Sequence, residues 1–341
     1  MCYAAKKPLV SDEYVLHYPS IDQYGDSLVL SGNLSVPAGK QPKGIILVPH
    51  YTIASNMDAP SVKMTADGRT FAEDYVVLVP DYLGYGLTAN RVHPYLHGEL
   101  TAHNCVDMLL YAQPKLDSMQ LGIPLDSIYI VGFSQGGASA MWTLKLLEEQ
   151  YADRIHVIKC FAGAGPYDVA VTYDEAMITN RSMMPMVIPL LFEGTNAAYD
   201  LQLDRANFFT PALEKVYSKY IEKKDHDIVT IFFKTLNHKV SHWISKPGRD
   251  MTRPETQRMY DGFVRSSLVH DTICPSWTPR SPLYIYHSKK DDVVTFRCAE
   301  RLQQCYKNLP NITYDFGNYG GHLQSSRRFF PKVKEMLDNQ R

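Results

Sequence analysis

The sequence predicts an α/β protein with a mostly parallel central sheet, flanking helices and one long, mainly helical insertion. Short apolar runs typical of buried strands alternate with segments of helical periodicity along most of the 341 residues. After Gly165-Pro166 this rhythm stops for roughly 110 residues, too many for a plain loop in a compact domain. We therefore expect a core of residues 1–165 and 280–341, with residues 166–279 inserted as a cap or lid.

The first half of the chain supplies most of the expected strands. Residues 12–19 and 27–36 predict a hairpin around the turn Gln23-Tyr24-Gly25-Asp26. Further buried strands are expected at residues 44–48, 75–79, 127–131 and 157–162, with helices at 100–113 and 137–149. The strand and helix alternation makes a parallel arrangement the expected one.

The insertion carries an unusual apolar stretch at residues 183–192, MMPMVIPLLF. Methionine side chains adapt their shape, which suits a pocket for an acyl group. The alternative is that this stretch forms only the internal core of the insertion. Beyond it, strands are expected at residues 282–287 and 311–316, and a last helix at 325–337.

Residues 132–136, Gly-Phe-Ser-Gln-Gly, lie between the strand at 127–131 and the helix at 137–149. A serine at such a turn is held on a sharp backbone with its hydroxyl exposed above the sheet, and glycines allow the close approach of neighbouring segments. Ser134 is therefore the candidate nucleophile.

A serine hydroxyl needs a base, and the base needs an orienting acid, which in this arrangement follow in the order Ser, Asp or Glu, His. Asp291 and Asp292 both follow the strand at residues 282–287, and periodicity does not separate them. His322 lies on a glycine-rich loop after the last expected strand. Because all three groups follow parallel strands, we expect them on one edge of the sheet.

Several motifs together resemble the α/β-hydrolase superfamily, and within it the secretory lipase group and related bacterial carboxylesterases. The resemblance covers roughly residues 40–335. It rests on Val79-Pro80-Asp81-Tyr82, His93-Pro94-Tyr95, Gly132-Phe133-Ser134-Gln135-Gly136-Gly137, Trp277-Thr278-Pro279 and Asp291-Asp292-Val293-Val294. The resemblance implies an α/β-hydrolase fold and assigns the acid to Asp291, the base to His322 and the nucleophile to Ser134.

An oxyanion hole needs two backbone donors. The first is expected to be the N–H of Gln135, directly after the nucleophile. The second usually follows an early strand, which points to the N–H of Tyr51. The resemblance to secretory lipases offers Asp81 as a rival.

Composition bounds the partners. With a net charge of −1, neither nucleic acid nor an anionic membrane is an expected partner, and no apolar run approaches the ~18 residues of a membrane span. The oligomeric state stays open.

The six cysteines contain no Cys-x-x-Cys pair and do not fix the compartment. Cys105 and Cys160 are expected as buried thiols, while Cys298 and Cys305 lie too far apart on one helix to bridge each other. A secreted or periplasmic location is favoured, and if Met1 is not native, Cys2 is a candidate for the lipid-bearing first residue of a processed lipoprotein.

Two other motifs point elsewhere. Residues 84–89 fit a dinucleotide-binding signature, but no helix is expected to open there. The pairs His93/His97 and His238/His242 have metal-ligand spacing without a neighbouring glutamate. We expect neither a cofactor nor a metal.

The sequence therefore predicts a serine hydrolase that cleaves small-molecule carboxylic esters, with an apolar group in the substrate, through an acyl-enzyme. The alternatives are a serine peptidase, an acyltransferase, and a binding protein that has lost catalysis.

Overall fold

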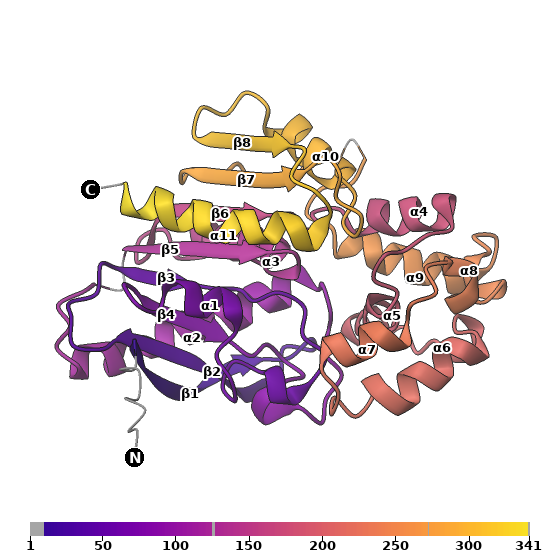
Figure 1. The fold of residues 1–341 in the computed structure, drawn as a ribbon, viewed down its shortest axis with the longest axis horizontal. Helices are drawn as coiled ribbons and strands as arrows, with labels where there is room; N and C mark the ends of the chain where they lie inside the picture. The colour runs from indigo at the N-terminus through magenta and orange to yellow at the C-terminus, as the bar shows by residue number, and fades with distance from the viewer. Residues whose placement is uncertain (1–9, 125–126, 272, 340–341) are drawn as a thin grey trace, which may run out of the picture.

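The computed structural model describes residues 10–124, 127–271 and 273–339, and its centre is an eight-stranded sheet (Figure 1). Across the sheet the strands follow the order β1-β2-β4-β3-β5-β6-β7-β8. Their bounds are β1 (Ser11–Ile21), β2 (Ser27–Pro37), β3 (Ile45–Leu47), β4 (Val76–Pro80), β5 (Ser127–Phe133), β6 (His156–Gly163), β7 (Leu283–Ser288) and β8 (Ile312–Gly317).

The sheet is mostly parallel, as the sequence predicts. The hairpin of β1 and β2 is confirmed, with Ile21 paired to Ser27, and β2 pairs antiparallel with β4. From β4 through β3, β5, β6 and β7 to β8, every neighbouring pair is parallel. The carboxyl ends of these strands therefore share one edge, where ligands bind in open α/β sheets.

Helices cover both faces of the sheet. The buried apolar cluster on one face includes residues of α2, α3 and α10, and the cluster on the other face includes residues of α1 and α11. The last of these, α11, crosses the sheet in Figure 1. The bounds are α1 (Ala66–Phe71), α2 (Gly98–Ser118), α3 (Gln135–Gln150), α10 (Arg297–Tyr306) and α11 (His322–Asp338), with the short turns η1 (Asn56–Asp58) and η2 (Gly86–Thr88).

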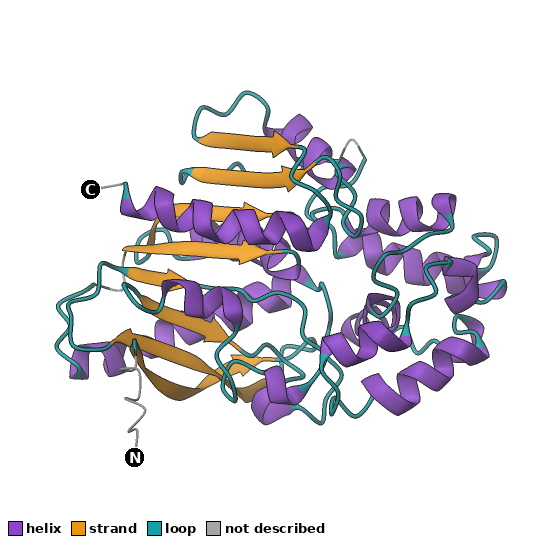
Figure 2. Ribbon diagram, in the orientation of Figure 1, coloured by secondary structure: helices purple, strands orange, loops and turns teal. Residues whose placement is uncertain are grey.

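Between β6 and β7 the described chain adds no strand to the sheet. Its helices gather beyond the carboxyl ends of the parallel strands, as Figures 1 and 2 show. They are α4 (Val169–Thr179), α5 (Val187–Ala198), α6 (Pro211–Val216), α7 (Ile228–Lys234), α8 (Val240–Trp243) and α9 (Pro254–Arg265), with the turns η3 (Arg205–Asn207), η4 (Tyr217–Ile221) and η5 (Pro247–Arg249).

This inserted segment has an apolar cluster of its own. Phe192 lies at its centre, with ring centroids 5.2 Å from Phe208 and 5.6 Å from Phe263. Met186 and Ile188, from the apolar stretch at residues 183–192, are buried in the same cluster. Part of that stretch therefore does form an internal core.

One arginine of α10 joins the two ends of the inserted segment. Arg301 pairs with Asp168 just before α4 and with Asp271 after α9. The imidazole of His270 adds a contact to Asp168 at 3.3 Å. The segment therefore leaves and rejoins the core at neighbouring points.

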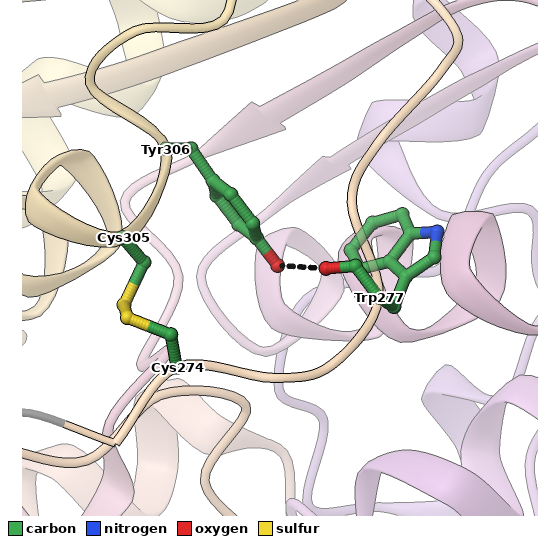
Figure 3. Close-up of a disulfide and its surroundings, with 4 residues drawn as sticks. All are labelled: Cys274, Trp277, Cys305 and Tyr306. Carbon is green, nitrogen blue, oxygen red and sulfur yellow. Dashed lines mark hydrogen bonds between the residues drawn. A yellow bond between two sulfur atoms is a disulfide. The ribbon is translucent and has the colours of Figure 1, made fainter.

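A disulfide between Cys274 and Cys305 fastens the exit of the segment to α10, with the two Cα atoms 5.5 Å apart (Figure 3). Beside it, the hydroxyl of Tyr306 donates a hydrogen bond to the carbonyl oxygen of Trp277 at 3.1 Å. The sequence did not reveal this pairing, although it correctly kept Cys298 and Cys305 apart.

The expectation of buried thiols at Cys105 and Cys160 is confirmed, and Cys298 is buried as well. All three are free thiols. Cys2 lies outside the described residues, so the lipoprotein hypothesis stays a prediction. Among the described helices, none combines the length and apolarity needed to cross a bilayer.

Candidate active site

Ser134 stands between β5 and α3 on a strained backbone, with φ 59° and ψ −125°. Its N–H donates a hydrogen bond to the carbonyl of Gly163 at the end of β6 (2.9 Å). A Cβ at residue 132 would meet the carbonyl oxygen of Gly136 at 2.0 Å, and a Cβ at residue 136 would meet that of Pro49 at 2.1 Å. Only glycine fits at those two positions, so the turn depends on both.

His322 reaches the hydroxyl of Ser134 from the first residue of α11, where the sequence placed it in a loop before the helix. Its Nε2 lies 2.8 Å from Ser134 Oγ, and its Nδ1 lies 2.8 Å from Asp291 Oδ2. Because a carboxylate only accepts hydrogen bonds, Nδ1 donates to Asp291 and Nε2 accepts from the serine. The three side chains form one line of hydrogen bonds.

The carboxylate of Asp291 is fully buried and held from several sides. Its Oδ1 accepts hydrogen bonds from the N–H groups of Val293 and Val294, at 3.0 and 2.9 Å. Burial raises the pKa of Asp291, but the contacts with His322 outweigh it and bring the net pKa below its usual value. Asp291 is therefore ionised at neutral pH.

Asp292 contacts a different part of His322, and this geometry favours Asp291 as the acid of the pair that periodicity does not separate. Its Oδ1 accepts the backbone N–H of His322 at 2.9 Å, rather than contacting the imidazole. The buried His287, from β7, lies 3.7 Å from Asp291 Oδ2 and bonds to the carbonyl of Val294 at 3.0 Å. Both residues hold the loop and the helix end that carry the line of hydrogen bonds.

The candidate oxyanion donors lie in different surroundings. Gln135 is the first residue of α3, where backbone N–H groups have no partner within the helix. Tyr51 lines the same cavity as Ser134, and its N–H donates to Asp67 Oδ2 at 3.3 Å. Asp81 is fully buried, and its N–H donates to the carbonyl of Ser31 at 2.9 Å.

Ser134 and His322 open onto a cavity of about 550 Å³ between the core and the inserted segment. The core side carries polar groups as well as apolar ones, including Asp67 and Arg327. Burial raises the pKa of Asp67 to about 6. The side made by the inserted segment is mostly apolar and includes Met184, Val187, Leu191 and Ile228.

The dinucleotide-like motif and the first histidine pair with metal-ligand spacing are engaged in local structure. Residues 86–88 form the short turn η2 rather than a long helix. His93 bonds to Leu83 and Gln135, and His97 accepts a hydrogen bond from the N–H of Leu100. In the described part of the chain, no group of three or more His, Cys, Asp or Glu side chains is arranged to hold a metal.

The sequence does not identify three residues near the site as parts of it. Asp67 lies in a short helix whose sequence gives no sign of a cavity wall, and His50 and His93 pack behind the candidate oxyanion donors. The motif His93-Pro94-Tyr95 was a usable signal, because it was already part of the family pattern.

A family model described as secretory lipase matches residues 52–332 of the chain. A secreted triacylglycerol lipase of Malassezia furfur, LIP5, is 25% identical over 234 residues, which cover 67% of this chain and 55% of that lipase. The chain therefore spans little more than half the length of this relative.

Solved structures share the fold at low identity. A putative hydrolase of Legionella pneumophila has a TM-score of 0.81 and 20% identity, covering 96% of this chain and 88% of its own. LipA of Xanthomonas oryzae, a rice cell wall degrading esterase, has a TM-score of 0.78 and 21% identity, with 97% and 92% covered. These matches establish an α/β-hydrolase fold.

Proposed function

The chain belongs to the secretory lipase family, and from this premise we propose that it is a serine hydrolase of carboxylic esters. The observation that carries the proposal is the line of hydrogen bonds from Asp291 through His322 to Ser134, which ends in the large cavity. It supplies a nucleophile, a base and an orienting acid in the order that acyl transfer requires.

In the proposed reaction, Ser134 Oγ attacks the ester carbonyl carbon while its proton moves to Nε2 of His322. The tetrahedral intermediate collapses, the alcohol leaves with the proton from His322, and an acyl-serine remains. Water then attacks the acyl carbon by the same proton route and releases the carboxylic acid. Asp291 stabilises the imidazolium in both halves, and its low pKa keeps it ionised.

The backbone N–H groups of Gln135 and Tyr51 are the proposed oxyanion donors. Tyr51 is favoured over Asp81 because Tyr51 lines the cavity, while the Asp81 N–H already has a buried carbonyl acceptor. The bond from Tyr51 to Asp67 is long at 3.3 Å, so the N–H can exchange that acceptor for an oxyanion. Such donors stabilise the transition state by a few kcal/mol each.

We assign residues 166–279 as a cap over the catalytic cavity. Its apolar side chains face the space above Ser134, which favours an ester with an apolar acyl or alcohol group. The family and the Cys274–Cys305 disulfide support a secreted protein, because disulfides persist in oxidising compartments.

The test is labelling with a fluorophosphonate probe, followed by competition with p-nitrophenyl esters of increasing acyl length. Ser134→Ala is expected to abolish labelling and hydrolysis, while Ser326→Ala, at another serine of the same cavity, keeps the label. Labelling that survives Ser134→Ala contradicts the proposal.

Two further measurements separate the chemistry from its alternatives. Faster cleavage of p-nitroanilide peptides than of esters identifies a peptidase. Accumulation of a new ester when an alcohol is added identifies an acyltransferase.

A further inference from the structure

Three buried aromatic rings stack behind the two proposed oxyanion donors. The ring of Tyr82 lies between those of His50 and His93, with centroid distances of 4.1 and 5.9 Å and interplanar angles of 22° and 8°. The three residues come from two different loops of the core, and all three are buried. The stack therefore joins loops that are distant in sequence at one place.

His93 ends this stack at the residue that follows the nucleophile. Its Nδ1 lies 2.7 Å from the carbonyl oxygen of Leu83, so Nδ1 carries the proton and donates it. Burial lowers the pKa of His93 to about 3, so the ring is neutral and Nε2 is left as an acceptor. The side-chain amide of Gln135 lies 2.9 Å from that Nε2 and donates to it.

Gln135 has its side chain fixed in this way directly beside a strained turn. The preceding Ser134 has a φ of 59°, a conformation that persists only when surrounding contacts hold it. The Gln135 carbonyl also accepts a hydrogen bond from Ser139 Oγ at 3.0 Å. The side-chain and carbonyl hydrogen bonds thus fix Gln135 from both sides, and with it the backbone N–H that is the proposed oxyanion donor.

The other end of the stack holds the second donor. His50 Nδ1 lies 2.6 Å from the carbonyl oxygen of Tyr51, and the hydroxyl of Tyr82 donates to the carbonyl of His50 at 3.2 Å. Burial lowers the pKa of His50 to about 4, so this ring is neutral as well. The two donor peptides are therefore tied to opposite ends of one uncharged stack.

We propose that His93 is a positioning residue of the oxyanion hole, which acts by accepting the Gln135 side-chain amide and so fixing the Gln135 backbone N–H. The inference rests on the proposed hydrolase function. Because an oxyanion hole works through donors placed before the reaction, a small misplacement weakens transition-state binding and leaves ester binding nearly intact.

The test is a double-mutant cycle with replacements of similar size that cannot form the bond, His93→Leu and Gln135→Met. Each single variant is expected to lower kcat for p-nitrophenyl butyrate by roughly 10- to 100-fold with KM within about threefold. The affinity for a trifluoromethyl ketone, which forms a tetrahedral adduct, should fall by the same factor as kcat. The double variant should be no slower than the worse single variant.

His93→Gln is the conservative variant that separates positioning from packing. Its side-chain carbonyl can accept from Gln135, so it should recover most of the lost kcat. Tyr85→Phe is the matched control on the same loop. It removes a buried hydrogen bond to the carbonyl of Ile53 without touching Gln135, so it should lower the melting temperature and leave kcat unchanged.

The inference is overturned by unchanged kcat in Gln135→Met, by single losses that multiply in the double variant, or by a fall in kcat without loss of ketone affinity. If His93→Leu does not fold, Gln135→Met and His93→Gln decide the question alone. Fluorophosphonate labelling of Ser134 in the unaltered protein keeps the two proposals distinct, because its absence refutes the hydrolase function itself.

Discussion

The two sides of the cavity at Ser134 are built by different kinds of interaction. On the core side, Ser134 and Asp291 follow strands β5 and β7, His322 begins α11, and hydrogen bonds of 2.8 Å connect the three side chains. On the inserted side, Leu191 and Ile228 belong to short helices held together by apolar packing. The proposed chemistry thus depends on precise angles, while substrate preference depends on shape and apolar area.

The two sides should differ in the changes that they tolerate. Removing a hydrogen-bond partner on the core side leaves a buried charge or donor unpaired, which is costly. Replacing an apolar side chain on the inserted side changes volume and local contacts, which usually costs less.

Asp291→Asn is expected to lower kcat by about 10⁴-fold, because an amide no longer stabilises the imidazolium and favours the wrong tautomer. Asp292→Asn is the matched control and should cost no more than about 10-fold, since the Asp292 carboxylate accepts from the backbone N–H of His322 rather than from its imidazole. Ester hydrolysis at saturating substrate measures both. Equal losses in the two variants would show that the acid has been assigned to the wrong residue.

Loss of the Cys274–Cys305 bridge should affect stability more than chemistry. The variant Cys274→Ser/Cys305→Ser is expected to lose roughly 2–4 kcal/mol of unfolding free energy in urea, because the unfolded chain gains freedom. At 25 °C, kcat for a short ester should be unchanged, since the bridge lies at the segment exit rather than in the cavity.

A reductant supplies the control for the bridge. It should reproduce the loss of stability in the unaltered protein and have no effect on the serine variant. If Cys274→Ser/Cys305→Ser lowered kcat as much as Asp291→Asn does, the bridge would be needed for the chemistry and not only for stability.

The buried Asp67 predicts a pH dependence of stability on the core side. Its pKa is about 6 when folded, against an ordinary value near 4, so between these limits the folded protein holds a proton that the unfolded chain releases. The unfolding free energy should therefore fall as the pH rises from 4 to 6, by up to about 3 kcal/mol.

Asp67→Asn isolates this contribution because the amide stays neutral. The difference in unfolding free energy between variant and unaltered protein should shift in favour of the variant from pH 4 to pH 7.5. The amide fits the N–H groups of Tyr51 and Gly68 less well, but this cost does not change with pH. The test is therefore how the difference in unfolding free energy changes with pH, not its absolute size. A flat difference would mean that Asp67 titrates normally.

The smallest effect is expected from the apolar wall. Leu191→Asn should lower kcat/KM for octanoate esters by about 10-fold and for acetate by less than about threefold, because burial of each methylene contributes up to about 0.8 kcal/mol. Leu190→Asn is the neighbouring control, as that side chain lines a different cavity. Equal losses for both esters would indicate that Leu191 does not contact the acyl chain.

The fold and the hydrogen-bonded line of Ser134, His322 and Asp291 could be predicted because their signals are local. Buried strands such as β5 and β7 show as short apolar runs, and a glycine-bounded serine between a strand and a helix is typical of a nucleophile turn. The parallel sheet then brings Ser134, Asp291 and His322 to one edge. Sequence order and chain geometry were enough to join them.

The features that escaped prediction depend on long-range contacts. The partner of Cys305 lies 31 residues away and depends on the path of the segment exit. Within residues 183–192, Met186 is buried in the segment core while Leu191 lines the cavity, and that division depends on helix rotation. The apolar stretch therefore contributes both to the internal core of the segment and to the cavity wall, and its composition alone does not separate these two roles.

Arg301 holds both ends of the inserted segment together, so the segment can be exchanged as one piece. Because Arg301 pairs with both Asp168 and Asp271, the two splice points of a chimaera would lie next to each other in space. Grafting residues 169–270 from another family member would replace the apolar wall and leave Ser134, His322 and Asp291 in place. Under the proposed function, exchange of this one segment changes which substrates fit the cavity while the reacting groups stay the same.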